Sequence, residues 1–146
     1  IAAAPFLRRY FEKFQAKKTA PVKSPGDVAL DRLEDLKKQD LPAQGKNKEY
    51  YTQLSDIIRK YVENHFQIRA NEMTTPEFLR SLKDSKDLTK EQKALLTEFM
   101  NCCDLVKFAK YGPTRVEMDE SFNAAKNFID ETKQKPAAVA PAETSK

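Results

Sequence analysis

Three short segments carry the signature of a helix start, and they constrain the fold more than any other feature of the sequence. Thr74, Thr89 and Thr114 are each followed three residues later by Glu77, Gln92 or Glu117. In such a capping box the threonine oxygen accepts a hydrogen bond from a free backbone amide, and the later side chain bonds back to the threonine amide. Apolar residues recur at helical spacing after each box: Phe78, Leu79 and Leu82; Leu95, Leu96, Phe99, Met100, Cys103 and Val106; and Met118, Phe122, Ala125 and Ile129.

Two further helices are expected upstream of these three. A broad apolar stripe, typical of a core-facing helix, runs from about Lys46 to Phe66, with Tyr50, Leu54, Ile57, Ile58, Tyr61, Val62 and Phe66. A shorter helix is expected from about Asp27 to Gln39, with Asp27 as its N-cap, and with Val28, Leu30, Leu33 and Leu36 as its apolar residues. The chain has only three glycines, which disfavours hairpins. We predict an all-α fold, a compact bundle of about five helices over residues 27–133.

The net charge of +4 is concentrated at the N-terminus. Residues 1–26 contain six basic and one acidic side chain, whereas residues 46–133 contain fifteen of each. On a helix, the first eighteen residues would carry an aromatic stripe beside basic residues: Phe6, Leu7, Tyr10, Phe11 and Phe14, with Arg8, Arg9, Lys13, Lys17 and Lys18. Such an arm is typical of the exit from a membrane span or of a segment on an anionic bilayer. Docking on the helical domain and contact with nucleic acid remain as alternatives.

The remainder of the chain offers little chemistry. Residues 134–146 are small, polar and rich in proline, so we expect a disordered tail. Cys102 and Cys103 are adjacent and unsuited to an ordinary disulfide, and a mid-helix position beside Asp104 disfavours their thiolates. Gly112 and Pro113 are expected to end that helix, with Gly112 in the left-handed conformation and Pro113 unable to continue the helix. His65 is the only histidine and has no second histidine for a metal site or triad. We predict no catalytic residue, metal, cofactor or small-molecule substrate.

Three segments of the chain resemble one known family. LSDIIRKYVE at 54–63, EMTTPEFL at 72–79 and DLVKFAKY at 104–111 are similar to the helical domain of unknown function in membrane proteins encoded with bacterial Bat (aerotolerance) genes, which include BatD-like proteins. The resemblance covers about residues 27–133. It departs at Cys102 and Cys103, where the family usually has small aliphatic residues.

The resemblance implies a single membrane span followed by a cytoplasmic helical domain with no established catalytic activity. It implies MoxR-type AAA ATPases and von Willebrand factor A domain proteins as candidate partners. In the last segment it places Leu105, Val106 and Phe108 in or near the core, and it makes Lys107, Lys110 and Tyr111 candidate partner contacts.

Together these observations predict a non-enzymatic scaffold or adaptor at the cytoplasmic face of the bacterial inner membrane. We expect a transmembrane segment upstream of Ile1, with residues 1–26 as the juxtamembrane arm and tether. One alternative is a nucleic-acid-binding helical module, although residues 46–133 carry no net charge with which to follow a phosphate backbone. The other is a redox protein that uses the thiols of Cys102 and Cys103.

Overall fold

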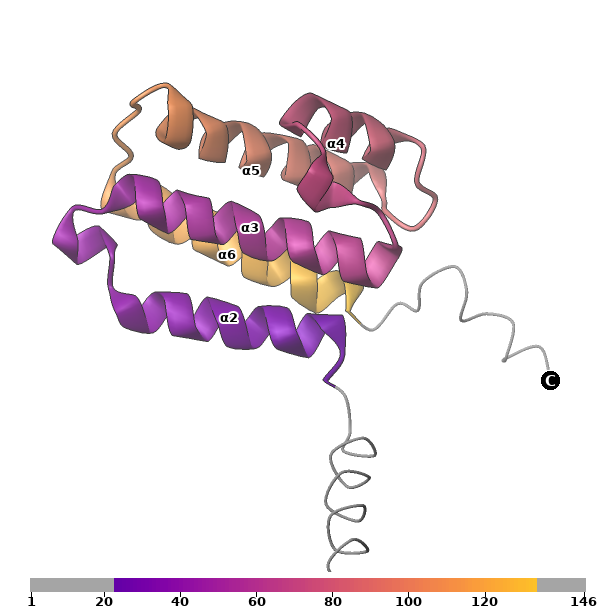
Figure 1. Cartoon of the computed structure of the whole chain (residues 1–146), viewed down its shortest axis with the longest axis horizontal. Helices are drawn as coiled ribbons and strands as arrows, with labels where there is room; N and C mark the ends of the chain where they lie inside the picture. The colour runs from indigo at the N-terminus through magenta and orange to yellow at the C-terminus, as the bar shows by residue number, and fades with distance from the viewer. Residues whose placement is uncertain (1–22, 134–146) are drawn as a thin grey trace, which may run out of the picture.

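The computed structural model describes residues 23–133, and all the regular secondary structure in this range is helical (Figure 1). The elements in chain order are α2 (Pro25–Gln39), η1 (Pro42–Gln44), α3 (Asn47–Phe66), η2 (Ala70–Glu72), α4 (Thr75–Lys83), α5 (Lys90–Phe108) and α6 (Arg115–Thr132). The prediction of an all-α bundle of about five helices is therefore confirmed. Residues 1–22 of the predicted arm and tether (1–26), and the predicted tail over 134–146, lie outside the described residues.

The long helix α3 lies at the centre of the bundle, between α2 and α5, with α6 beside it (Figure 1). The short helix α4 packs against α5. Two buried tyrosines of α3 also bond to α6: the Tyr51 hydroxyl is 3.0 Å from Ser121 Oγ, and the Tyr61 hydroxyl is 2.6 Å from Thr132 Oγ1. Burial raises the pKa of Tyr61 to about 12. Because each buried hydroxyl has a partner, these contacts align α6 along α3 without leaving a buried hydroxyl unsatisfied.

All three predicted capping boxes are formed, with both hydrogen bonds of each box present at Thr74, Thr89 and Thr114. The predicted N-cap of the first described helix is wrong. Ser24, not Asp27, caps α2, and its Oγ accepts a hydrogen bond from the Asp27 amide at 3.2 Å. Pro25 occupies the first helical position, where its lack of an N–H group is harmless and its fixed φ suits the helix.

The predicted apolar stripe of α2 is partly wrong. The residues of α2 that face the core are Ala29, Leu33 and Leu36, with Leu30 half-buried at the margin. Val28 is 41% exposed and lies outside this face. Val28 was predicted to face the core because it is more apolar than Ala29. In the structure α2 lies close to α3 and α6, and the side chain that this close contact buries is the smaller one, Ala29.

The end of α5 also differs from the prediction. The helix stops at Phe108, and the Ala109 and Tyr111 amides both donate to the Leu105 carbonyl, at 3.0 and 3.1 Å. Lys110 adopts the left-handed conformation with φ of 57°. Gly112 does not, so the prediction that glycine provides the left-handed residue is wrong. The chain reverses before Gly112 because the Tyr111 amide already satisfies a carbonyl of the last turn.

Candidate functional site

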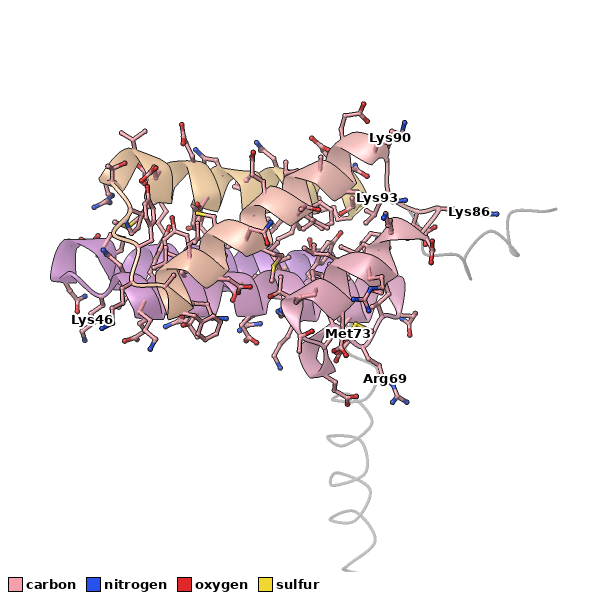
Figure 2. The ribbon with its side chains drawn as sticks, turned by 90° about the horizontal axis from the view of Figure 1, so that it is seen from above. Lys46, Arg69, Met73, Lys86, Lys90 and Lys93 are labelled. Atoms are coloured by element: carbon pink, nitrogen blue, oxygen red, sulfur yellow. The ribbon has the colours of Figure 1, made fainter. Side chains whose placement is uncertain are left out.

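A groove of about 630 Å³ opens between α3, the turn that precedes α4, and the last turns of α5. Its volume lies within the range of known ligand pockets. Met73, which lies in the turn before α4, is labelled in Figure 2. The groove is lined by Thr52, Gln53, Ser55, Asp56, Arg59, Met73, Thr74, Thr75, Pro76, Asp104, Lys107 and Phe108. We call it the α3–α5 groove.

Arg59 forms one wall of the α3–α5 groove and is held by three hydrogen bonds. Its Nη1 donates to the carbonyl oxygens of Ala70 and Met73, at 2.8 and 2.7 Å, and its Nη2 donates to Thr75 Oγ1 at 2.9 Å. The guanidinium also lies 5.2 Å from the ring centroid of Phe78. Burial lowers the pKa of Arg59, and nearby carboxylates, Asp104 first, oppose that effect. The guanidinium stays charged, because free arginine titrates far above neutral pH.

Lys107 reaches into the α3–α5 groove from the opposite helix. Its Nζ lies 3.3 Å from the hydroxyl of the buried Ser55 and 5.1 Å from the ring centroid of Phe108. An ammonium group has three donors, so one hydroxyl contact leaves capacity for a ligand. Asp104 lines the same groove and is half-buried. The groove therefore presents a lysine and a carboxylate side by side.

At the apolar edge of the groove, the prediction for Leu105 and Phe108 is wrong. Phe108 is 73% exposed and Leu105 is 49% exposed, so neither lies in the core, whereas Val106 is buried as predicted. On a helix Phe108 is about 200° around the axis from Val106, which explains why both cannot face the core. Leu105 and Phe108 thus leave apolar side-chain surface exposed at the end of α5.

Of the three predicted contact residues, only Lys107 lines the α3–α5 groove. Lys110 is exposed in the turn after α5. The Tyr111 hydroxyl instead donates to the Glu117 carboxylate, at 2.8 and 2.9 Å, and this bond raises the pKa of Tyr111. The Thr114 amide and then the Tyr111 hydroxyl lower the pKa of Glu117. Tyr111 thus closes the turn into α6.

The two cysteines have different environments. Cys103 is fully buried among the core residues of α5, and burial is the largest of the effects that raise the pKa of its thiol. Cys102 is half-buried, with its Sγ 3.9 Å from Ser121 Oγ. A raised thiol pKa opposes the thiolate that nucleophilic and redox chemistry require.

His65 lies at the end of α3, stacked on Tyr61 with ring centroids 5.2 Å apart and edge-on to Phe66 at 4.6 Å. Its Nε2 is buried without a hydrogen-bond partner. Between residues 23 and 133, no three His, Cys, Asp or Glu side chains are grouped closely enough to hold a metal ion. None of the helices in that range has the length and apolar character needed to cross a bilayer.

Several groove residues carried no recognisable signal in the sequence. Arg59 and Ser55 interrupt the apolar stripe of α3 as ordinary polar residues would, and Met73 and Thr75 belong to a capping segment. They meet only because η2 returns the chain against α3. For Phe108 a signal was present, because its angular position relative to Val106 follows from helix geometry alone.

No protein-family model matches the chain, and no curated protein or solved structure is detectably similar to it. The resemblance to the Bat-associated domain consequently stays a prediction from the three sequence segments.

Proposed function

We propose that the chain is a non-enzymatic scaffold or adaptor domain that binds a protein partner through the α3–α5 groove and the exposed end of α5. The observation that carries this proposal is Phe108, a large apolar side chain that is 73% exposed at the edge of a groove containing Lys107 and Asp104. Aromatic anchors flanked by polar groups supply most of the binding energy in many protein interfaces.

The network around Arg59 supports a binding role for the groove. Its three hydrogen bonds hold one wall in place. A preformed rigid surface lowers the entropic cost of binding.

The candidate partners come from the sequence resemblance: a MoxR-type AAA ATPase or a von Willebrand factor A domain protein. We further propose that the arm containing Phe6–Lys18 holds the domain at the cytoplasmic face of a bacterial inner membrane. Such tethering would raise the effective concentration of the domain near a membrane-bound partner.

The docking proposal is tested with purified candidate partners and two matched variants. Phe108→Ser removes the exposed aromatic ring from α5, whereas Val28→Ser removes an exposed apolar side chain from α2, which lies across α3 from α5 (Figure 1). Isothermal titration calorimetry should show binding weakened about thirtyfold by Phe108→Ser, the loss expected for an aromatic anchor. Val28→Ser should bind like the parent chain. Equal affinities for all three proteins would refute the role of Phe108.

The tethering proposal has a separate test. The chain with its natural upstream sequence should float with liposomes containing anionic lipid, and neutral substitutions of Arg8, Arg9, Lys13, Lys17 and Lys18 should weaken flotation of residues 1–146 by themselves. Recovery of the natural protein in the soluble fraction would rule out the membrane adaptor.

A further inference from the structure

A second groove, of about 300 Å³, lies between the end of α4 and the first half of α5. It is lined by Leu79, Arg80, Leu82, Lys83, Lys93 and Thr97. We call it the α4–α5 cleft. Three of its six lining residues are cationic and none is acidic, and it shares no residue with the α3–α5 groove.

Basic side chains continue around the rim of this cleft. Lys86 and Lys90 lie with Lys93 at one end of the molecule, around the turn that joins α4 to α5, whereas Lys46 lies at the other end (Figure 2). Among residues 23–133, no ion pair involves the five cations of this surface, which are Arg80, Lys83, Lys86, Lys90 and Lys93. Their charges are consequently available to a ligand.

Some cations elsewhere on the described surface are paired with a carboxylate, whereas those of the cleft are not. Arg32 lies 3.1 Å from Asp56, and Arg115 lies 3.5 Å from Asp119. Asp84, Asp87 and Glu91 are close in sequence to the cleft cations but are not within ion-pair distance of them. The fold therefore keeps the positive charges of the cleft separate from the nearby carboxylates.

Lys93 is positioned by the fold rather than left free in solvent. It is half-buried, and its Nζ donates to the Lys83 carbonyl at 2.8 Å, at the end of α4. Two of its three donors remain for other partners. The exposed Arg80 has no hydrogen-bond partner among the described residues, and its planar guanidinium can bind a carboxylate through two parallel hydrogen bonds.

We propose that the α4–α5 cleft binds an acidic segment of a protein partner. Carboxylates of that segment would bond to Arg80, Lys83 and Lys93, and a neighbouring apolar side chain would cover the half-buried Leu79. Charge complementarity selects this occupant, because a cleft with three cations and no carboxylate favours negative ligands and repels positive ones. The inference does not depend on the role proposed for the α3–α5 groove.

A protein segment fits better than a nucleic acid. Residues 80–93 contain three acidic side chains beside the five basic ones, and a phosphate backbone would meet both. Nucleic-acid affinity arises from many successive phosphate contacts and grows with their number. A short peptide needs only the few cations that line the cleft.

The test uses the full chain and a short labelled peptide of alternating glutamate and leucine, with a second peptide in which glutamine replaces each glutamate. Fluorescence anisotropy compares the parent chain with Arg80→Gln/Lys83→Gln and with the control Lys48→Gln/Lys60→Gln. The control removes the same charge from exposed lysines of α3 and leaves the N-terminal arm and the cleft intact. We expect the cleft variant to bind the acidic peptide about tenfold more weakly, the loss typical of a charge-assisted contact, and the control to bind normally.

Four outcomes would overturn the proposal. Equal weakening in both variants would mean that net charge alone attracts the peptide. Equal binding of the glutamine peptide would mean that carboxylates are not recognised. Tighter binding of duplex DNA or of phosphatidylserine vesicles, lost in the cleft variant, would assign the cleft to phosphates. Self-association of the chain, lost in the same variant, would assign it to a second copy. Thermal unfolding of both variants checks that they are folded.

Discussion

At the scale of single residues, side chains of one type have different roles according to where the fold places them. Arg59 donates three hydrogen bonds to the turn before α4 and to the first residue of α4, whereas the side chain of Arg80 has no hydrogen-bond partner among residues 23–133. Cys103 is fully buried and the neighbouring Cys102 is half-buried. Each difference reflects the angular position of the residue on its helix, which decides whether it meets another helix or water.

The cysteine pair gives a prediction about stability and redox chemistry. Cys103→Ala should lower the free energy of unfolding by about 1 kcal/mol, comparable to the loss of one buried heavy atom elsewhere. Cys102→Ala should change it by less than about 0.5 kcal/mol, because that side chain is only half-buried. Urea denaturation of the two variants measures both values. The redox alternative predicts instead an activity that is lost in the double variant with no change in melting temperature.

At the scale of helices, the ends of the elements are stabilised by local hydrogen bonds. The capping boxes at α4, α5 and α6 are formed within four consecutive residues each, and this is why they were readable in the sequence. At α6 the box is extended, because Tyr111 adds its hydroxyl to the Glu117 carboxylate. The end of α5 and the start of α6 are thereby joined across the turn.

This arrangement predicts a dependence of stability on pH. The folded-state pKa of Glu117 lies below its ordinary value of 4.5, because the Thr114 amide and the Tyr111 hydroxyl donate to its ionised form. That contribution is present at pH above the ordinary value and is lost as the pH falls through the lowered pKa. Glu117→Gln keeps an acceptor for the amide but does not titrate, so its stability should decrease less than that of the parent chain on acidification.

Urea midpoints measured between about pH 6 and pH 3 would reveal the difference, since carboxylates titrate in that window. Glu120→Gln is the matched control on the same helix, because Glu120 is exposed and has no hydrogen-bond partner among the described residues. If Glu117→Gln and Glu120→Gln showed the same acid dependence as the parent chain, the carboxylate of Glu117 would not stabilise the cap.

At the scale of the whole molecule, the bundle is closed by contact between its first and last described helices. Gly26, in the first turn of α2, lies against Lys133 at the end of α6. A Cβ atom added at Gly26 would lie 2.5 Å from the Lys133 Cβ. Only glycine allows the two helices to approach this closely.

Gly26→Ala should therefore destabilise the protein by about 1 kcal/mol, although alanine is ordinarily the better helix residue by a similar amount. Gly112→Ala is the matched control, since nothing lies within 4 Å of the position of its Cβ and its φ is not positive. It should be neutral or slightly stabilising, by up to about 1 kcal/mol. Thermal and urea unfolding would distinguish the two, and stabilisation by Gly26→Ala would show that α2 and α6 are not in close contact.

The sequence by itself determined the helical class of the fold, the core-facing stripe of α3 and the starts of three helices. These properties depend on capping and on apolar spacing, which act between residues a few positions apart. Of the three residues predicted as partner contacts, the structure places only Lys107 at the α3–α5 groove.

Only the tertiary structure decided that Arg59, Ser55 and Thr75 meet Lys107 around one groove, and that cations of α4 and α5 lie together in one cleft. Each of these properties requires segments distant in the chain to approach one another. The helix preferences of single residues do not predict which segments will pack together. In this protein η2 packs back against α3, and α4 packs against α5, and these contacts bring the segments together.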